Sequence, residues 1–375
     1  MKTVKLSDVV KRANTKEDRF NTSLLYYVGG EHIETDNVVI KERGLIKGST
    51  IGPMFYFGFK KGDVLLVSRN PHLRKSGMVS FDGICSEKTF VLETNDERIL
   101  LQDYLPFIFQ SDHFWEYAES HKSGSVNFFL NWSTLANYEF ILPELDEQKK
   151  LAEVLWQIVD TMESYKKLLA KTDEMVKAKF NELLLKNERT CKIRDYVELP
   201  ITKITKDTKF DEIQYIDISS IDKDLRIIQG TTNYQLNNAP SRAQQIVKKN
   251  DILISTVRPN LKTFAIINLE ADNLIASTGF CVLRVQKCPL YYLYGIINSD
   301  IFTNQMISEA TGISYPAVND GNILNFKIPD ISEEQQKYLA DLVAKTEESK
   351  AAIQTSLNSL SAVYKKIIAE NLGGR

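Results

Sequence analysis

The stretch SGSVNFFLNWSTLANYEFILPELDEQKKLAEVL, residues 123–155, is matched later in the chain by TGISYPAVNDGNILNFKIPDISEEQQKYLADLV, residues 311–343. In both copies an apolar run reaches a proline, Pro143 or Pro329, and acidic residues and glutamine follow it. Proline and the residue before it end a strand, and acidic residues suit the first turn of a helix. Each copy therefore predicts a strand that leads into a helix.

Three further pairs of segments keep the same order along the chain. Residues 4–10 match 191–197, residues 59–68 match 247–256, and residues 84–93 match 275–284. The period of about 188 residues is far longer than the roughly 20 to 50 of solenoids and propellers, so two copies of a whole domain are indicated. Strand-like runs at 64–67, 252–254 and 280–285 and a helical run at 290–306 predict that each copy is an α+β domain.

Two long helices are expected at about 146–187 and 332–371, because both segments lack proline and glycine and are rich in helix formers. Apolar residues recur there at alternating steps of four and three, as in the seam of a coiled coil. The seam residues are Leu151, Leu155, Ile158, Met162, Tyr165, Leu169, Val176 and Leu183, and then Leu339, Val343, Ile353, Leu357, Leu360, Tyr364 and Ile367. The repeated seam predicts that the helices pack on each other, antiparallel, with the duplicated units related by a pseudo-two-fold axis.

These patterns give four predicted segments. They are a first globular domain at 1–143, a central long helix at 144–188, a second globular domain at 189–329 and a C-terminal long helix at 330–375. With 375 residues, of which 43% are hydrophobic and 26% charged, the chain can bury cores of this size.

Composition limits the function in several ways. The first residues carry charges where a secretory signal needs an apolar run, and no apolar stretch is long enough to cross a membrane, so a cytoplasmic protein is expected. The net charge of −2 argues against a chain that coats nucleic acid by charge alone. Four cysteines without metal-ligand spacing suggest neither a metal site nor a disulfide framework.

We find no motif for catalysis in this sequence. There is no glycine-rich phosphate loop ending in lysine, and no Pro-Pro pair of the kind a DNA methyltransferase uses around its target base. All four histidines lie in the first half, so the two copies cannot share histidine chemistry. The sequence therefore predicts a binding protein without an active site or cofactor of its own.

The chain resembles the specificity subunits of type I restriction-modification systems over nearly its whole length. The resemblance rests on the strand Gly62-Asp63-Val64-Leu65 and its partner at 250–253, on the glycine turns at 123–126 and 311–314, and on the helix starts at 142–148 and 328–335. It implies that each domain is a target-recognition domain that reads one half of a split double-stranded DNA site. It also implies that the helices dock two DNA methyltransferase subunits and set the half-site spacing. Restriction subunits would join the complex, and S-adenosylmethionine, ATP and magnesium would bind to partner subunits.

Direct reading of DNA needs exposed donors and acceptors with basic neighbours. The loop after the 62–67 strand and its counterpart in the second half best match this need. The expected DNA-binding residues are Arg69, Asn70, His72, Arg74 and Lys75 in the first loop and Arg258, Asn260 and Lys262 in the second. Ser123, Gly124, Thr311, Gly312 and Tyr315, in the other repeated polar loop, are further candidates, although a tight turn explains the glycines equally well.

Two other classes of protein remain open at this point. A coiled-coil scaffold or adaptor without a role in nucleic-acid binding would explain the helices but not the duplicated domains. A free-standing transcription factor is disfavoured because no helix-turn-helix pattern stands out and the net charge is close to neutral.

Overall fold

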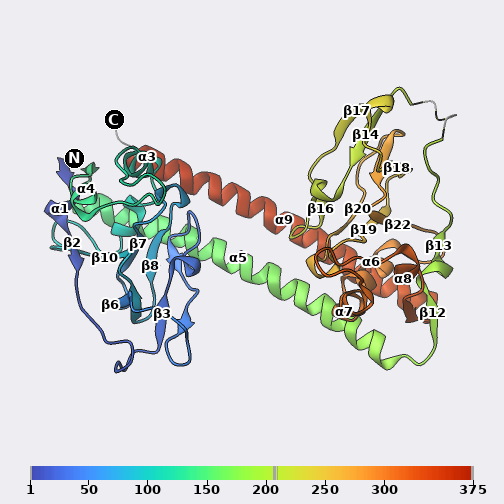
Figure 1. Cartoon of the computed structure of the whole chain (residues 1–375), viewed down its shortest axis with the longest axis horizontal. Helices are drawn as coiled ribbons and strands as arrows, with labels where there is room; N and C mark the ends of the chain where they lie inside the picture. The colour runs from blue at the N-terminus through green and yellow to red at the C-terminus, as the bar shows by residue number, and fades with distance from the viewer. Residues whose placement is uncertain (1, 206–207, 209, 373–375) are drawn as a thin grey trace. The chain divides into compact units, whose positions relative to one another are not determined.

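The computed structural model describes residues 2–205, 208 and 210–372. The chain forms two compact units (Figure 1). Unit 1 contains residues 1–166 and 355–375, and unit 2 contains residues 167–354. Each unit therefore includes one half of each long helix. The predicted domain boundaries at 143 and 329 stay predictions, because the units divide the chain by packing rather than by sequence.

Unit 1 has two main sheets. The first has the order β2-β10-β7-β8-β4 and the second the order β5-β3-β9-β6, with β1 and β11 forming a separate pair. The strands are β1 (Lys2–Lys5), β2 (Val10–Ala13), β3 (Tyr26–Val28), β4 (Val39–Ile40), β5 (Gly44–Leu45), β6 (Phe55–Phe59), β7 (Val64–Val67), β8 (Ser76–Val79), β9 (Gly83–Ser86), β10 (Thr89–Thr94) and β11 (Glu139–Leu142).

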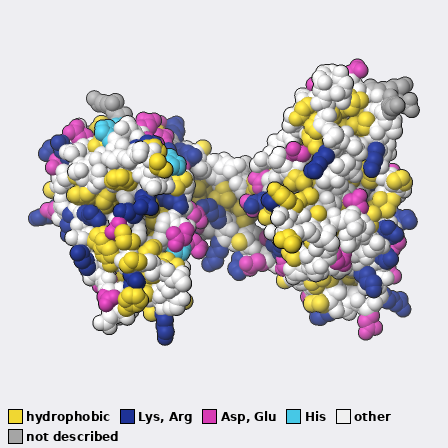
Figure 2. Space-filling view, viewed as in Figure 1, with side chains coloured by type: hydrophobic (Ala, Val, Ile, Leu, Met, Phe, Trp, Pro, Cys, Tyr) yellow, Lys and Arg dark blue, Asp and Glu magenta, His cyan; other side chains and the backbone are white. Residues whose placement is uncertain are grey.

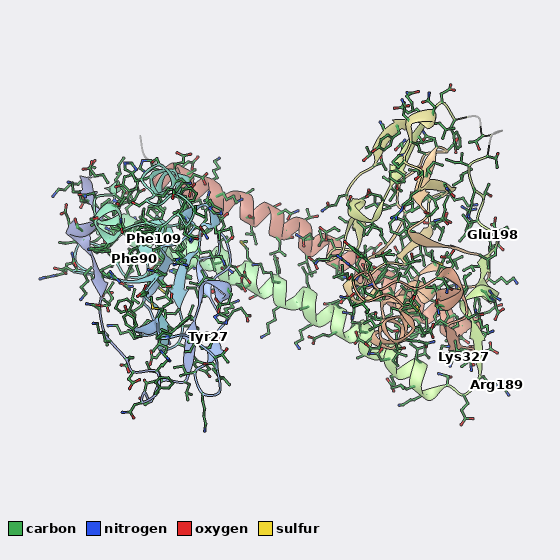
Figure 3. The ribbon with its side chains drawn as sticks, viewed as in Figure 1. Tyr27, Phe90, Phe109, Arg189, Glu198 and Lys327 are labelled. Carbon is green, nitrogen blue, oxygen red and sulfur yellow. The ribbon has the colours of Figure 1, made fainter. Side chains whose placement is uncertain are left out.

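Unit 2 repeats this topology. Its main sheets have the orders β13-β22-β19-β20 and β17-β14-β21-β18, while β12 pairs with β23 and β15 with β16. The strands are β12 (Thr190–Lys192), β13 (Val197–Glu198), β14 (Glu212–Ile216), β15 (Ile221–Asp222), β16 (Ile227–Ile228), β17 (Thr232–Gln235), β18 (Ala243–Ile246), β19 (Asp251–Ser255), β20 (Phe264–Ile266), β21 (Leu274–Ser277), β22 (Phe280–Val285) and β23 (Lys327–Pro329). The two parallel pairs β3·β9 and β14·β21 also correspond. Lys327 of β23 pairs with Lys192 of β12, and Arg189 directly precedes β12 (Figure 3).

Short helices cover each body. Unit 1 has α1 (Leu6–Val9), α2 (Leu105–Ile108), α3 (Asp112–Ser120) and α4 (Trp132–Ala136), and unit 2 has α6 (Leu290–Asn298), α7 (Asp300–Glu309) and α8 (Asp320–Leu324). Ser111 and Ser299 cap α3 and α7 by accepting a hydrogen bond from the N–H of Phe114 and Phe302. The predicted helical run at 290–306 is thus two helices that meet at Ser299. Phe90 and Phe109 lie in the core beneath the helices of unit 1 (Figure 3).

The strand after each Gly-Asp or Asn-Asp pair is buried on both faces. In β7, Val64 and Leu66 face the core that the helices cover, whereas Leu65 faces the core between the sheets. Alternate strand residues point to opposite faces, and in β19 Ile252 and Leu253 divide between two cores in the same way. The α+β fold and these duplicated strands agree with the sequence prediction.

The long helices are α5 (Leu145–Lys186) and α9 (Glu333–Leu372), close to the predicted bounds. In unit 1, Ala152, Leu155 and Val159 of α5 share a core with Ile368 and Leu372 of α9. In unit 2, Val176 and Phe180 of α5 share a core with Leu339, Ala340 and Val343 of α9. Opposite halves of the two helices are therefore packed together, as an antiparallel pair requires.

Burial along the helices differs in detail from the predicted seam. Leu155, Val176, Leu339, Val343 and Leu357 are buried, and the other predicted seam residues are half-buried. Ala152, Val159, Phe180, Ala340, Ile368 and Leu372 are also buried but fall outside the predicted a/d pattern. Each helix half packs on a globular body as well as on the other helix, so its apolar face is wider than a coiled-coil seam.

The matching of the two helix starts needs one correction. The two helix-start motifs at 142–148 and 328–335 end at Gln148 and Gln335, but Gln335 is exposed, and Gln336 is the residue that is buried like Gln148. The side-chain amide of Gln148 donates to the carbonyl of Pro143, and that of Gln336 donates to the carbonyl of Ile331. Both carbonyls are five residues earlier in the chain. The two long helices therefore begin in the same register of the repeat.

The turn before β7 and the turn before β19 have the same backbone, but the buried aspartate beside each turn has a different neighbour in the two units. Gly62 and Asn250 both have positive φ, 93° and 71°. Asparagine tolerates this region better than most residues, which explains why it can stand in unit 2 where unit 1 has glycine. Asp251 is 1% exposed and pairs with Arg284 at 2.8 Å. Asp63 is 3% exposed, and the strand partner that corresponds to Arg284 is Glu93. Burial raises the pKa of Asp63 to about 6.

We predict that the free energy of unfolding contains a term from Asp63 that decreases as pH rises. The folded state holds this proton more tightly than the unfolded chain, so the term is complete below about pH 4 and is lost as pH rises through about 6. The shift corresponds to about 2 to 3 kcal/mol. Asp63→Asn and Glu93→Arg should each raise the stability at pH 7, and Asp63→Asn should leave it unchanged at pH 4, as measured by denaturant unfolding.

Asp251→Asn is the matched control for this experiment. It removes the buried carboxylate that pairs with Arg284 and leaves this arginine only the more exposed Glu198, at 3.6 Å, so it should lower stability at pH 7. If Asp63→Asn lowered stability at pH 7 as much as Asp251→Asn, Asp63 would not be the destabilised carboxylate that its burial indicates.

Candidate nucleic-acid interface

Two loops that lie far apart in the sequence meet in unit 1. The loop at 68–75 follows β7, and the loop at 123–129 lies between α3 and α4. The N–H of Asn70 donates to the carbonyl of Phe128 at 2.9 Å, and the N–H of Leu130 donates to the carbonyl of Ser68 at 2.8 Å. The two groups of candidate residues in this unit therefore form one continuous structure, which we call the loop pair.

Unit 2 has the same loop pair, formed by residues 256–263 and 311–317. The N–H of Arg258 donates to the carbonyl of Pro316 at 2.7 Å, and the N–H of Val318 donates to the carbonyl of Thr256 at 2.9 Å. By these bonds Arg258 corresponds to Asn70, and Arg69 corresponds to Val257. Sequence reasoning placed Arg69 and Arg258 in matching loops, but they occupy neighbouring rather than equivalent positions.

The first loop of each pair has an unusual backbone that both units share. A single 3-10 turn, Pro71–Leu73 or Pro259–Leu261, is flanked by two non-glycine residues in the left-handed region. Their φ angles are 51° and 48° for Asn70 and Arg74, and 52° and 51° for Arg258 and Lys262. Left-handed residues other than glycine cost roughly 1 kcal/mol or more. The fold maintains this strain twice, so the loop geometry is fixed rather than adaptable.

Three of the predicted DNA-binding cations are held by groups of their own unit. Arg74 places Nε 2.6 Å from Asp36 and Nη1 2.6 Å from Asp112. Lys262 lies 2.8 Å from Asp300, and Lys75 donates to the carbonyl of Gly30. Because Asp112 and Asp300 are the first residues of α3 and α7, these ion pairs fasten the loop to the helix behind it.

The remaining candidates of the first loop face solvent. Arg69, His72, Arg258 and Asn260 are exposed, and Asn70 is half-buried. The guanidinium of Arg258 lies 4.9 Å from the ring centre of Tyr315, which is itself 70% exposed. This stacking holds the arginine near an aromatic face in water. Arg69 and Arg258 are therefore the candidate cations that the structure leaves available.

The second loop of each pair is a tight turn that requires its glycine. Gly124 and Gly312 have φ angles of 101° and 96°, and a Cβ on Gly124 would lie 2.5 Å from the carbonyl oxygen of Asn127. Ser123 pairs with Phe129 and Thr311 with Ala317 through two backbone hydrogen bonds each. The glycines thus have a structural role, while Ser123 and Thr311 close the turn through their backbone.

Sequence reasoning missed two features of this site. The repeated pattern Ser-Asp-x-Phe, at 111–114 and 299–302, provides both the helix cap and the aspartate that holds the loop. Its recurrence at the period of the whole repeat is the signal that could have revealed it. The tips also expose apolar side chains: Val126 is 83% and Ile313 is fully exposed.

The surface outside the loop pairs carries mixed charge. Lys and Arg side chains are interspersed with acidic and apolar ones on the face in view (Figure 2), in keeping with the net charge of −2. Among the described residues no group of three or more His, Cys, Asp or Glu is placed to hold a metal ion. Within that same part of the chain, no helix is long and apolar enough to cross a membrane. The four cysteines are free thiols.

The fold and the loop pairs define a duplicated protein that presents the same pair of loops on each of two similar units. Comparison with known proteins shows which of them the chain is similar to. Residues 1–172 match the family described as Type I restriction modification DNA specificity domain. A curated relative, the Type I restriction enzyme HindI specificity subunit of Haemophilus influenzae, is 28% identical over 129 residues. This match spans 33% of the present chain but only 28% of that relative. Residues 1–172, a little less than half of the chain, are therefore similar to type I restriction-modification specificity domains.

Solved structures show the same fold over the full chain. The type I restriction-modification S subunit from M. genitalium superposes with a TM-score of 0.63 at 13% identity, covering 100% of this chain and 96% of that one. A chain from a study of complex assembly and conformational transition of the type I system has a TM-score of 0.52 at 16% identity, covering 100% and 97%.

We predict that replacing the ion-paired cations of the first loop lowers the free energy of unfolding more than replacing its exposed arginines. Arg74→Ala and Lys262→Ala each remove an ion pair that fastens the loop to a helix, and should lower the free energy of unfolding by about 1 kcal/mol or less. Arg69→Ala and Arg258→Ala should change it by less than about 0.5 kcal/mol, since both are exposed. Denaturant unfolding measures the difference. Equal losses in all four variants would contradict this division.

Proposed function

We propose that this chain reads DNA sequence for a type I restriction-modification enzyme, with each unit binding one half of a split double-stranded site. The observation that carries the proposal is the repeated loop pair. Two units with the same strained loop each present an exposed arginine, Arg69 or Arg258, beside exposed polar residues. Arginine is the side chain that most often reads guanine in the major groove, and it also binds phosphate.

The wider role in the complex is also a proposal. The long helices dock two methyltransferase subunits and set the distance between half-sites, and restriction subunits join the assembly. S-adenosylmethionine, ATP and magnesium bind to the partner subunits, and this chain supplies specificity without catalysis. Its supports are the similarity of residues 1–172 to type I specificity domains and the wide apolar faces of α5 and α9. The exposed apolar residues Leu168, Met175, Leu185 and Val363 on these helices offer contacts for partners.

We predict that Arg69→Ala and Arg258→Ala weaken DNA binding by the assembled enzyme. A lost base contact costs about 1 to 3 kcal/mol and relaxes one position of the site. A lost phosphate contact weakens binding to all sequences and lowers the salt slope by about one. Fluorescence anisotropy over a range of salt concentrations separates the two outcomes.

Arg98→Ala is the control for this measurement, because Arg98 is an exposed arginine in another loop of unit 1, where it pairs with Asp96. It should leave affinity and salt slope unchanged. If the two loop variants behaved like Arg98→Ala, the loop pairs would lie outside the DNA interface. A complex that bound no DNA at all would favour a scaffold role instead.

We further predict that the two units read DNA independently. Replacing residues 1–143 with the equivalent segment of a relative should change one half of the methylated site and leave the other half as it was. Arg69→Ala should alter the first half-site only, and Arg258→Ala the second only. The measurement is methylome sequencing of a host that expresses each variant with its methyltransferase. A change in both half-sites from a single variant would contradict independent reading.

A further inference from the structure

Unit 1 contains a cavity that the loop pair does not use. Its volume is about 320 Å³. The turn at 34–38, the start of α3, the N-terminal half of α5 and the C-terminal half of α9 line it, and it opens to solvent. Cavities of roughly this size lie at the lower end of the range that binds small molecules.

The equivalent place in unit 2 is filled by polar side chains. Arg226 donates to both oxygens of Asp173 at 2.9 and 3.1 Å. The side-chain oxygen of Asn181 accepts from the first two N–H groups of α7, at 3.1 and 3.3 Å. Arg226, which precedes β16, thus binds α5 through Asp173, and Asn181 of α5 binds the start of α7.

The same three positions in unit 1 carry small or apolar residues. At the period of the repeat, Arg226 corresponds to Val38, Asp173 to Ser361, and Asn181 to Ala369. All three counterparts line the cavity. The cavity in unit 1 therefore lies at the place where Arg226, Asp173 and Asn181 lie in unit 2.

These replacements leave hydrogen-bond donors without acceptors in unit 1. The N–H groups of Asp112 and His113 correspond to those that Asn181 binds in unit 2, and no acceptor for them occurs in the described part of the chain. The hydroxyl of Tyr364, which lines the cavity, is buried without a hydrogen-bond partner. Burial raises the pKa of Tyr364, so the hydroxyl keeps its proton.

The charges around the cavity leave one cation available. Arg74 neutralises Asp36 and Asp112, and Glu163 pairs with Lys41 and with Lys166 at 3.1 Å.

The remaining charged residues that line the cavity are Glu34 and Lys365. Glu34 accepts a hydrogen bond from Asn37. Lys365 corresponds to Lys177, which binds Asp173 at 2.7 Å in unit 2, but in unit 1 that aspartate is replaced by Ser361. Lys365 forms no ion pair with the residues that the structure describes. The cavity thus presents hydrogen-bond donors, and a ligand that supplies oxygen acceptors would satisfy them.

We propose that this cavity binds a small organic carboxylate. One carboxylate oxygen accepts from the N–H groups at the start of α3, as the oxygen of Asn181 does at α7. Tyr364 and Lys365 donate to the remaining oxygens. Helix N-termini favour anions through their free N–H groups and dipole. This site is separate from the loop pair and does not depend on DNA recognition.

The test places a side chain of the second unit into the cavity of the first. Calorimetric titration of the full chain with glutarate and with L-glutamate should show saturable binding, and the neutral glutaramide should bind at least tenfold more weakly. Ala369→Asn provides the equivalent of the Asn181 side chain at α3 and should reduce glutarate affinity at least tenfold without lowering the melting temperature. Tyr364→Phe removes one donor and should weaken binding several-fold.

Ala362→Asn is the matched control, since Ala362 is an exposed alanine of the same helix that does not line the cavity. It should bind glutarate like the natural chain. If the natural chain showed no saturable binding of glutarate or L-glutamate, the proposal would be overturned. This would hold even if an acidic side chain of a partner protein occupied the cavity in the assembled enzyme. Binding that Ala369→Asn leaves unchanged would also overturn it.

Discussion

Halves of the two long helices complete the core of each unit, and in unit 1 one of these halves comes from a distant part of the chain. In unit 1 the core beneath α2 and α3 is completed by Ile368 and Leu372 of α9, whereas the last strand of that unit, β11, ends at Leu142. In unit 2, Phe180 lies against Gly295, where a Cβ would come within 2.3 Å of the phenyl ring. Unit 1 is not a contiguous segment, so it cannot bury its core until the whole chain has been made. The globular body of unit 1 and the C-terminal half of α9 must therefore fold together.

The two units share the course of the backbone but differ in their buried charges. Asp251 with Arg284 in unit 2 corresponds to Asp63 with Glu93 in unit 1, and Arg226 with Asp173 corresponds to Val38 with Ser361. Removing one partner of a buried ion pair is costly, whereas replacing both is often neutral. Arg226 and Asp173 have both been replaced, and the result is a cavity. Asp63 has kept its carboxylate without the arginine, and the result is a raised pKa.

The backbone could be predicted from the sequence to a large extent, and the side-chain partners could not. The strands at 64–67 and 280–285 and the two long helices are local patterns, set by apolar runs and by the absence of proline and glycine. The width of the buried helix face was not predictable, because it depends on bodies that pack against the helix from elsewhere in the chain. In the same way, Arg74 looked like a free cation because its partners, Asp36 and Asp112, lie far from it in the sequence on either side.

The loop pairs separate what is fixed from what is variable. Backbone hydrogen bonds join the two loops in both units, and the ion pairs of Arg74 and Lys262 hold the first loop to a helix. Side chains that project from equivalent positions differ: Asn70 against Arg258, and Asn127 against Tyr315. A rigid frame lowers the entropy lost on binding, and changes at the projecting positions alter which chemical groups are met. Under the proposed function, two copies of one frame can therefore read two different half-sites without any change of fold.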